Sequence, residues 1–351
     1  MEAFDKLANY FLKDVGIDLG TTNSLVYVKG RGIVINDPSI TAINNKTGQV
    51  VAIGEDARKM LGRTPSHISI IKPLINGVIS DFEMTQEMLR HFFKRLNGQR
   101  AFNYFRAVIG IPPNLTEVER KSVEDAVISA GAAKAYLIEE PIAAAIGARL
   151  PIKDAVATMI VDIGGGTVDI AVISMGGTVI SKSLKIAGDK FNDDILKFIR
   201  DEFKLIIGEP TAEELKKAIG SAVPLNERLE LAIRGRGVSN GLPMEVVIKN
   251  SQIRAALNRS LHAIIDNIKE VIEETPPELV GDILKRGIYL CGGGSLLRGI
   301  DQLIAKEVAV PVTIVDDPLT AVVRGTGVAA ENLNEYNHIF VTALKPLDIN
   351  T

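Results

Sequence analysis

An aspartate followed by a glycine-hydroxyl turn is the first group of residues in the chain that could do chemistry. Asp18 ends an apolar strand-like run and is followed by Gly20, Thr21, Thr22 and Asn23. Glycine has no Cβ, so a ligand can approach such a turn closely, and its successive amide groups suit an anion. A carboxylate beside a phosphate is repulsive, so Asp18 predicts an intervening Mg²⁺ with its retained waters. A simple β-hairpin with a Gly-Thr turn is the alternative.

The same pattern returns one domain length later in the chain. Asp162 ends a second apolar strand and precedes Gly164, Gly165, Gly166 and Thr167. Three successive glycines weaken a hairpin unless something must come close to the backbone. Repetition at this interval indicates a duplicated domain rather than a short solenoid repeat. Two such hairpins facing one another would hold a polyphosphate from both sides.

A third glycine cluster follows an apolar strand that ends at Cys291. Its members are Gly292, Gly293, Gly294 and Ser295. We expect a helix over residues 296–306, and a strand–glycine–helix junction offers amide groups to a nucleoside or phosphate. Glycine at a strand-to-helix turn is also common for purely structural reasons. Cys291 is interpreted as a small buried apolar residue because no His partner is evident.

Glu140 is a candidate catalytic carboxylate. Pro141 suits the first position of a helix, which would place Glu140 at the N-cap, at the positive end of the helix dipole. A carboxylate fixed there beside a cleft could orient an attacking water or accept its proton. A simple helix cap is the alternative.

Short β-branched runs alternate with helical patterns and must position these groups. Strands are predicted at residues 15–18, 25–28, 107–111, 159–162, 170–174 and 287–290. Helix starts are predicted at Thr116 and Thr211, each followed three residues later by a glutamate, as in a capping box. Apolar residues recur at helical spacing over 254–274. Strands alternating with helices of this length predict an α/β fold.

The helix predicted at residues 211–220 is charged. Its charges are Glu213, Glu214, Lys216 and Lys217. Most charges on such a helix are solvated. The pattern leaves open whether any of them borders a base or a ribose.

Composition excludes several classes of function. The 351 residues include 40 basic and 43 acidic side chains, a net charge of −3, so no polybasic field favours nucleic acid. One cysteine cannot form an intramolecular disulfide, and the N-terminus does not resemble a cleavable signal. No run of apolar residues is long enough to span a membrane, and the four histidines form no cluster at zinc-ligand spacing. We therefore expect a reduced, cytoplasmic protein with more than one lobe.

The N-terminal stretch could lie on a membrane surface. Met1, Phe4, Leu7 and Phe11 fall on one face of a predicted amphipathic segment that covers residues 1–14. This segment carries more acidic than basic side chains, which anionic lipid does not favour. Packing on its own lobe is the alternative. Phe102, among adjacent aromatic residues, is a second candidate for membrane contact.

Taken together, these motifs resemble a known family. The diagnostic stretches are residues 27–39, 60–65, 77–82, 137–147, 162–169 and 290–297. They are similar to the MreB family of bacterial actin-like proteins, in the superfamily of actin, sugar kinases and heat-shock chaperone ATPases. The resemblance covers most of residues 15–335.

The resemblance implies an α/β fold of duplicated actin-like (ribonuclease H-like) domains. Two lobes, each with a large and a small subdomain, would enclose a nucleotide cleft. The implied segments are the following: 15–30, 77–150 and 325–340 for subdomain IA; 31–76 for IB; 151–186 and 251–324 for IIA; 187–250 for IIB; and a tail at 341–351. The tail matches no motif.

The resemblance also implies roles for the candidate residues in binding Mg-ATP. Phosphate contacts would come from Gly20, Thr21, Thr22 and Asn23, and from Gly164, Gly165, Gly166 and Thr167. The adenosine would lie by Gly292, Gly293, Gly294 and Ser295, flanked by Glu213, Glu214, Leu215 and Lys216. Asp18 and Asp162 would hold Mg²⁺ through water, and Glu140, helped by Thr167, would position the hydrolytic water.

For function, the resemblance implies a filament-forming ATPase that maintains rod shape and organises cell-wall synthesis. Hydrolysis would be coupled to polymerisation into antiparallel double protofilaments at the inner face of the cell membrane. Its partners would be further copies of the chain, the membrane surface and elongation proteins such as RodZ, MreC and MreD, with no nucleic acid. A DnaK-type chaperone ATPase is the alternative because residues 16–24 are common to both families; a small-molecule kinase is the third.

Overall fold

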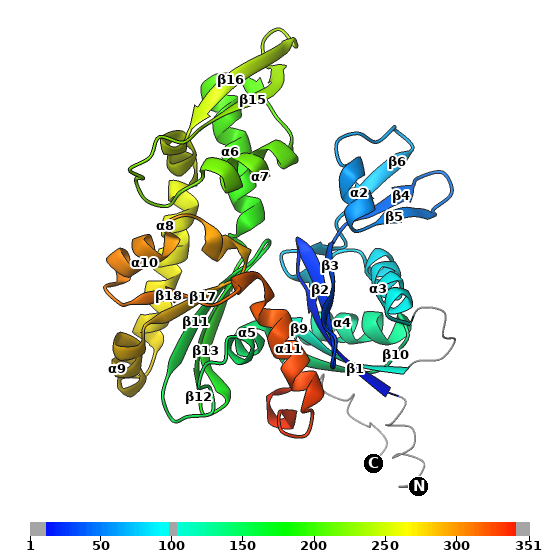
Figure 1. Cartoon of the computed structure of the whole chain (residues 1–351), viewed down its shortest axis with the longest axis vertical. Coiled ribbons are helices and arrows are strands. Elements are labelled where there is room, and N and C mark those ends of the chain that lie inside the picture. Colours follow the sequence, from blue (N-terminus) through cyan, green and yellow to red (C-terminus); the bar gives the residue numbers. More distant parts are fainter. Residues whose placement is uncertain (1–11, 98–103, 342–351) are drawn as a thin grey trace. The chain divides into compact units, whose positions relative to one another are not determined.

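The computed structural model describes residues 12–97 and 104–341, and the chain forms two compact units (Figure 1). Unit 1 comprises the chain up to Pro151 and again from Thr320 onward. Unit 2 comprises Ile152–Leu319. Within the described residues no helix combines the length and the apolar character that crossing a bilayer requires. The finer division into four subdomains stays a prediction.

Unit 1 is built on a five-stranded sheet of order β10-β9-β1-β2-β3. Its strands are β1 (Leu12–Leu19), β2 (Asn23–Val28), β3 (Gly32–Pro38), β9 (Tyr104–Ile111) and β10 (Ala132–Glu139). The first three form an antiparallel meander, while β1, β9 and β10 are parallel. The helices of this unit are α3 (Phe82–Asn97), α4 (Glu117–Ser129), α5 (Glu140–Gly147) and α11 (Ala321–Glu331).

Apolar side chains of β1, β9, α3 and α4 form the core of unit 1. A smaller sheet of order β5-β4-β6 lies in the same unit, with a short helix and a two-stranded hairpin. These elements are β4 (Thr41–Asn44), β5 (Val50–Ile53), α2 (Glu55–Met60), β6 (Ile68–Ile71), β7 (Leu74–Ile75) and β8 (Val78–Ile79).

Unit 2 repeats the sheet of unit 1 with the same connectivity. Its order is β13-β12-β11-β17-β18, again an antiparallel meander followed by two parallel strands. The strands are β11 (Thr158–Ile163), β12 (Val168–Ser174), β13 (Gly177–Leu184), β17 (Ile288–Cys291) and β18 (Val312–Ile314). The duplication that the two Asp-x-Gly motifs predict is therefore present at the level of sheet topology.

The remaining elements of unit 2 surround this sheet or form a second, three-stranded one of order β14-β15-β16. They are α6 (Gly188–Phe203), β14 (Leu205–Ile206), α7 (Glu209–Ile219), β15 (Glu230–Gly237), β16 (Pro243–Lys249), α8 (Asn250–Glu274), α9 (Pro277–Arg286), the 3₁₀ turn η1 (Gly293–Leu296) and α10 (Ile300–Val308). One continuous apolar core joins β11, β12, α6, α7 and α8.

The α/β fold and the positions of the predicted strands are confirmed, and so is the capping box at Thr116. The helix starts predicted at residues 211 and 296 are wrong. Helix α7 begins at Glu209 rather than Thr211, because Pro210 suits a first helical turn and Gly208 is the N-cap. No α-helix begins at residue 296, because Gly299 has a left-handed φ of 73° and delays α10 to Ile300.

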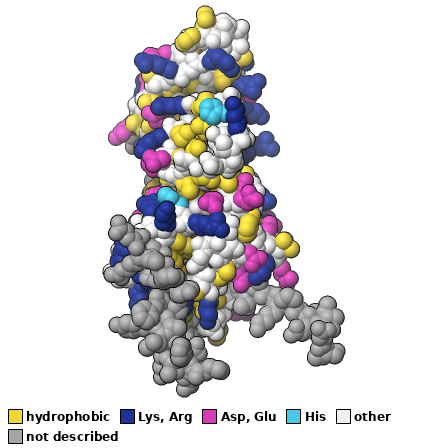
Figure 2. Space-filling model, turned by 90° about the vertical axis from the view of Figure 1, so that its right-hand side faces the viewer, with side chains coloured by type: hydrophobic (Ala, Val, Ile, Leu, Met, Phe, Trp, Pro, Cys, Tyr) yellow, Lys and Arg dark blue, Asp and Glu magenta, His cyan; other side chains and the backbone are white. Residues whose placement is uncertain are grey.

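The face of the chain in Figure 2 is mixed in charge. On the described part of the face in Figure 2, Lys and Arg side chains lie interspersed with Asp and Glu. This distribution agrees with the net charge of −3.

Candidate functional site

The loop between β1 and β2 is held by three hydrogen bonds from other parts of unit 1. The amide of Gly77, in the β7–β8 turn, donates to Thr21 Oγ1 at 3.0 Å. Ser39 makes the other two: its Oγ donates to the carbonyl of Gly20 at 2.5 Å, and its amide donates to the carbonyl of Thr22 at 2.9 Å. Because the Thr21 hydroxyl accepts from Gly77, its own proton remains available to a ligand.

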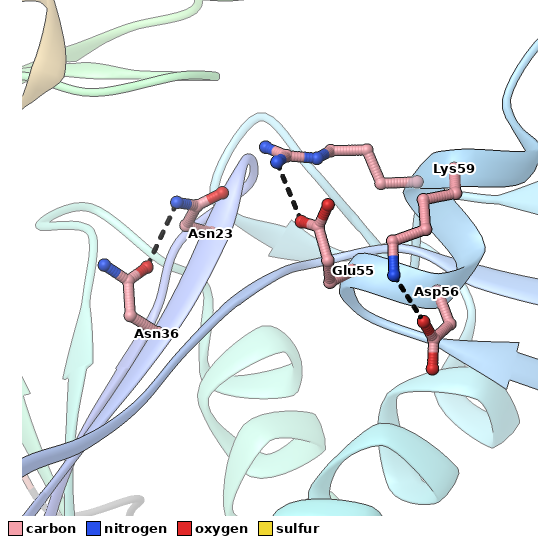
Figure 3. Close-up of polar contacts among 6 residues, drawn as sticks. Asn23, Asn36, Glu55, Asp56 and Lys59 are labelled. Carbon is pink, nitrogen blue, oxygen red and sulfur yellow. Dashed lines mark hydrogen bonds and ion pairs between the residues drawn. The ribbon is translucent and has the colours of Figure 1, made fainter.

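Asn23 begins β2 beside this loop, and its amide Nδ2 donates to Asn36 Oδ1 at 3.2 Å (Figure 3). The acidic residues in the first turn of α2, drawn in the same view, pair with bases of their own helix. Glu55 pairs with Arg58 at 2.8 Å, and Asp56 pairs with Lys59 at 2.9 Å. These two ion pairs lie within α2 and do not involve Asn23. The Asn23 amide is fixed by Asn36 on β3, the neighbouring strand of its own sheet.

Asp18 and Glu140 lie on either side of Gly110 at the carboxyl ends of the parallel strands. Asp18 on β1 is in register with Gly110 on β9, and a Cβ added to Gly110 would lie 3.3 Å from Glu140 Cγ. Burial raises the pKa of Asp18 from 3.8 to about 7. Within residues 12–97 and 104–341, Asp18 forms no ion pair with a basic side chain. Two acidic residues thus lie next to Gly110, and Asp18 lacks a basic partner among the described residues.

Helix α5 begins one residue earlier than the sequence predicts. Its N-cap is Glu139, and Glu140 is its first helical residue, so the N-cap assignment of Glu140 was wrong by one position. Pro141 still lies in the first turn, where its missing amide proton costs nothing. Glu140 is only 9% exposed, so its carboxylate is held in a mostly dry environment at the positive helix end.

The position of α5 is fixed by close packing against α11. A Cβ on Gly147 would lie 1.9 Å from the carbonyl oxygen of Ala321, and one on Gly325 would lie 1.7 Å from that of Ala143. No side chain fits at either place, so the two helix backbones are in direct contact. This contact sets where Glu140 lies.

The loop between β11 and β12 in unit 2 is held mainly by backbone contacts. The amide of Gly164 donates to the carbonyl of Thr167 at 2.9 Å, which closes the turn. At the N-terminus of α6, the amide of Gly188 donates to the carbonyl of Gly164 at 3.1 Å, and that of Asp189 donates to Gly165 at 2.7 Å. The start of α6 therefore lies directly against the glycine loop.

The third glycine cluster packs on the end of β11. Gly292 has a φ of 77°, and its Cβ would lie 2.2 Å from Asp162 Oδ1. A Cβ on Gly294 would lie 2.2 Å from Ile163 Cγ2. Ser295 is fully buried, and its Oγ donates to the carbonyl of Gly292 at 2.7 Å. The Gly292–Ser295 cluster therefore packs against Asp162, as expected if both belong to one binding site.

Helix α7 reaches the same region through one lysine. Lys216 Nζ donates to the carbonyl of Gly188 at 3.0 Å and pairs with Glu213, which also pairs with Lys217 at 2.9 Å. Burial by itself would raise the pKa of Glu213, but the charge of Lys216 and the hydrogen bonds from Lys216, Lys217 and Asn192 outweigh it and lower the pKa to about 2. Glu214 is exposed, whereas the Leu215 side chain is fully buried in the core of unit 2.

The structure therefore groups the predicted residues in two sets, one in each unit. Unit 1 joins Asp18, the loop from Gly20 to Asn23, and Glu140. Unit 2 joins Asp162, the loop from Gly164 to Thr167, the cluster from Gly292 to Ser295, and Lys216 with Glu213. Met1, Phe4, Leu7, Phe11 and Phe102 lie outside the described residues.

Sequence reasoning missed four residues that shape these sets: Ser39, Gly77, Gly110 and Gly188. Three of them act through the backbone or the absence of a side chain. An Asn-Gly pair at residues 76–77 is a recognised hairpin signal and could have located that turn. No local pattern links Ser39 to a loop nineteen residues earlier.

The acidic groups fit a hydrated divalent cation better than a directly ligated one. In the part of the chain that the structure describes, no group of three or more His, Cys, Asp or Glu side chains could hold a metal ion. Asp18 is a carboxylate at a strand end whose pKa is raised by burial. A nearby cation would relieve that cost, and Mg²⁺ commonly binds through few carboxylates while it keeps several waters.

The family model for the MreB/Mbl protein matches residues 12–338. The chain belongs to the MreB/Mbl family. The cell shape-determining protein Mbl of Bacillus subtilis is 48% identical over 325 residues, which cover 93% of this chain and 98% of Mbl. The cell shape-determining protein MreB of Escherichia coli is 44% identical over 334 residues, with coverage of 94% and 96%.

Solved structures agree with this assignment to the MreB/Mbl family. The crystal structure of MreB5 of Spiroplasma citri bound to ADP superposes with a TM-score of 0.88 at 40% identity, covering 92% of this chain and 98% of that one. The same MreB5 has also been solved bound to AMPPNP. The MamK double helical filament, at 24% identity and a TM-score of 0.77, shares the fold. The predicted actin-like fold is thereby confirmed.

Proposed function

We propose that the chain is an ATP-dependent, filament-forming protein that maintains rod cell shape and organises cell-wall synthesis. Membership of a family of actin-like, cell shape-determining proteins supports this proposal. The observation that carries it is that Asp18 and Glu140 both lie next to Gly110, beside a loop whose hydroxyl and amide groups suit phosphate. The MreB5 structures bound to ADP and to AMPPNP support an adenine nucleotide as the ligand.

The nucleotide-binding groups of each unit follow from its own contacts. In unit 1, the Thr21 hydroxyl is oriented by Gly77 to donate to a phosphate oxygen. In unit 2, glycines of the Gly164–Thr167 loop would let a phosphate approach the backbone, and the Gly292–Ser295 cluster would offer its backbone to the nucleoside. Asp18 and Asp162 would hold Mg²⁺ through water, and Mg²⁺ would neutralise charge on the phosphates.

Glu140 is the proposed catalytic residue. Its carboxylate begins α5, is largely shielded from solvent, and is held in place by the α5–α11 contact. From there it orients the attacking water and accepts its proton, while Thr167 helps to position that water. Hydrolysis is coupled to polymerisation, because assembly brings the water and Glu140 into line.

We further propose that the filaments are antiparallel double protofilaments on the inner face of the cell membrane. The predicted amphipathic stretch at residues 1–14 and the apolar Phe102 region are the elements proposed to contact lipid. Elongation proteins such as RodZ, MreC and MreD are the proposed partners, and the localisation is cytoplasmic and peripheral. Nucleic acid is not a proposed partner, given the net charge of −3.

The test of this function measures pelleting and phosphate release with ATP and Mg²⁺. Glu140→Ala should bind nucleotide and pellet like the wild type while phosphate release falls by about 100-fold or more, the usual contribution of a general base. Glu117→Ala is the matched control, since Glu117 is the exposed first residue of α4. Normal turnover in Glu140→Ala would refute the role of Glu140, and absence of ATP-dependent pelleting in the wild type would refute filament formation.

A further inference from the structure

A cavity of about 250 Å³ lies in unit 1 at the end of the sheet where β1 begins. Three basic side chains line it: Lys13 from β1, and Lys29 and Arg31 from the turn between β2 and β3. None of these residues belongs to the nucleotide-binding groups described above. The cavity therefore needs an explanation of its own.

The β2–β3 turn places two of these bases by tight backbone geometry. The amide of Arg31 donates to the carbonyl of Val28 at 2.9 Å, and the amide of Lys29 donates to the carbonyl of Asp14 on β1 at 3.3 Å. Gly30 and Gly32 have φ angles of 73° and 71°, which only glycine adopts without strain. The turn is thus shaped to hold Lys29 and Arg31 on either side of Gly30, close to β1.

The positive charge at the cavity is not balanced by the acid that lines it. Asp14 is already engaged by Arg106, whose Nε and Nη2 donate to its two carboxylate oxygens at 2.7 and 3.0 Å. Lys29 Nζ donates to the backbone carbonyl of Glu331 at 3.4 Å, a neutral partner. Across residues 12–97 and 104–341, neither Lys29 nor Arg31 forms an ion pair. The cavity therefore favours an anion.

The rest of the lining is apolar. Val28, Leu96 and Phe105 contribute to the wall, and Phe105 is backed by Phe93, with ring centroids 4.9 Å apart. An inorganic anion gains nothing from such a wall. Val28, Leu96 and Phe105 belong to the core of unit 1 and expose only a small apolar area here, so an anion attached to an apolar body can place its charged group on the bases and an apolar edge against that area.

The place of the cavity in the chain favours a lipid as the source of that anion. Lys13 lies within the first predicted membrane-contacting stretch, residues 1–14, and Phe105 follows closely after Phe102, the second. The first stretch is acidic on balance, so it supplies no attraction to an anionic membrane. Lys13, Lys29 and Arg31 supply that attraction at a cavity whose lining includes Lys13 and Phe105, which adjoin the two stretches in the sequence.

We propose that this cavity binds the phosphate group of an anionic phospholipid through Lys13, Lys29 and Arg31. The proposal rests on the proposed membrane association and names the lipid class that the association selects.

The test is flotation with ATP and Mg²⁺ on vesicles of phosphatidylcholine, with and without phosphatidylglycerol. Each base removed from an anionic surface should weaken binding about fivefold, the equivalent of ~1 kcal/mol, so Lys29→Gln with Arg31→Gln should weaken it about 25-fold. The matched control is Lys46→Gln with Arg63→Gln, which removes the same charge from two exposed positions of unit 1. Thermal unfolding and pelleting with ATP should be unchanged in both pairs.

The outcomes separate this proposal from the one on which it rests. Loss of binding in the Lys29 and Arg31 pair alone, seen only with phosphatidylglycerol, supports the cavity. Equal losses in both pairs, or no loss in either, overturn it while membrane association stands. A wild type that floats with neither vesicle overturns membrane association itself. Saturable binding of inorganic phosphate that is abolished by Lys29→Gln and Arg31→Gln overturns lipid as the ligand.

Discussion

The β1–β2 loop of unit 1 and the β11–β12 loop of unit 2 occupy the same place in duplicated sheets but are held in different ways. Side chains take part in holding the first: hydroxyl groups of Thr21 and Ser39 make two of its three hydrogen bonds, and the Ser39 amide makes the third. The second is held by backbone amides of α6 and by glycines that leave room for Asp162. Duplication has therefore preserved the sheet and the aspartate while the supports diverged. Removal of a hydroxyl should therefore perturb the first loop, and a methyl group added at Gly292 should perturb the surroundings of the second.

The largest effect should come from Gly292→Ala. The added Cβ would lie 2.2 Å from Asp162 Oδ1, at a φ of 77°. Overpacking and the left-handed backbone together should destabilise unit 2 by about 3–5 kcal/mol and abolish nucleotide binding. Chemical denaturation and titration with a fluorescent ATP analogue measure both. Gly293→Ala is the control, since its nearest contact is the end of the Leu319 side chain at 3.2 Å; a similar loss there would contradict the packing argument.

Asp18→Asn should reveal the cost of the buried carboxyl in unit 1. The pKa of the Asp18 carboxyl is about 7 in the folded protein, against 3.8 for an ordinary Asp. Without Mg²⁺ and nucleotide, the wild type should therefore lose stability as pH rises from about 4 to about 7. At about 1.4 kcal/mol per pKa unit, Asp18→Asn should be more stable at pH 8 by about 2–4 kcal/mol. Thermal unfolding across this pH range measures the difference.

Asp18→Asn should also remove the pH dependence of Mg²⁺ binding in the presence of ATP. In the wild type, Mg²⁺ with ATP should bind more tightly as pH rises through about 7, because Asp18 must lose its proton to attract the cation. Parallel stability curves for the wild type and Asp18→Asn would show that burial does not raise this pKa.

Thr21→Val should have a moderate effect that is specific to unit 1. Valine has nearly the shape of threonine but cannot accept from the Gly77 amide, which would then lose its partner in a partly buried place. The cost should be about 1–2 kcal/mol of unfolding free energy, with weaker nucleotide binding. Thr22→Val, at an exposed position of the same loop, should leave the unfolding free energy within about 0.5 kcal/mol of the wild type.

The smallest effect should come from Lys216→Met in unit 2. Lys216 is 15% exposed and links α7 to Gly188, so its loss should cost about 1 kcal/mol. Lys217→Met is the matched control, because Lys217 pairs with the same Glu213 but is 72% exposed. The lowered pKa of Glu213 contributes stability above about pH 4.5, and this stability is lost as pH falls toward 2. The unfolding free energies of the two variants should therefore converge in acid. Equal costs at pH 7 would contradict a link through Gly188.

The sequence predicts the sheets well because their signals are local. Alternating β-branched runs predict the strands, and the two Asp-x-Gly motifs predict the duplication that the strand orders display. Chain contacts that depend on distant residues could not be predicted in this way. Two examples are the hydrogen bond from the Ser39 hydroxyl to the Gly20 carbonyl and the close backbone contact between Gly325 and Ala143. Neither contact produces a periodic pattern in the sequence.

Helix ends were the other weakness of prediction. Glu140 was placed at the N-cap because Pro141 commonly takes the first helical position, but Pro141 also tolerates the second. The capping-box pattern succeeded at Thr116, where the glutamate side chain returns to the cap, and failed at Thr211, where Gly208 and Pro210 start the helix earlier. Competing start signals within three residues cannot be ranked without the packing of the helix.

The α11 helix has a consequence for how the chain is made. It emerges from the ribosome after all of unit 2, yet its backbone lies against Gly147 in α5 and against Gly16 in β1, where a Cβ would lie 2.4 Å from the amide of Gly327. The first unit to be synthesised therefore cannot finish its interior until nearly the last residues arrive. A nascent chain stalled before residue 320 would expose the apolar surface that α11 covers and would call for a chaperone during that interval.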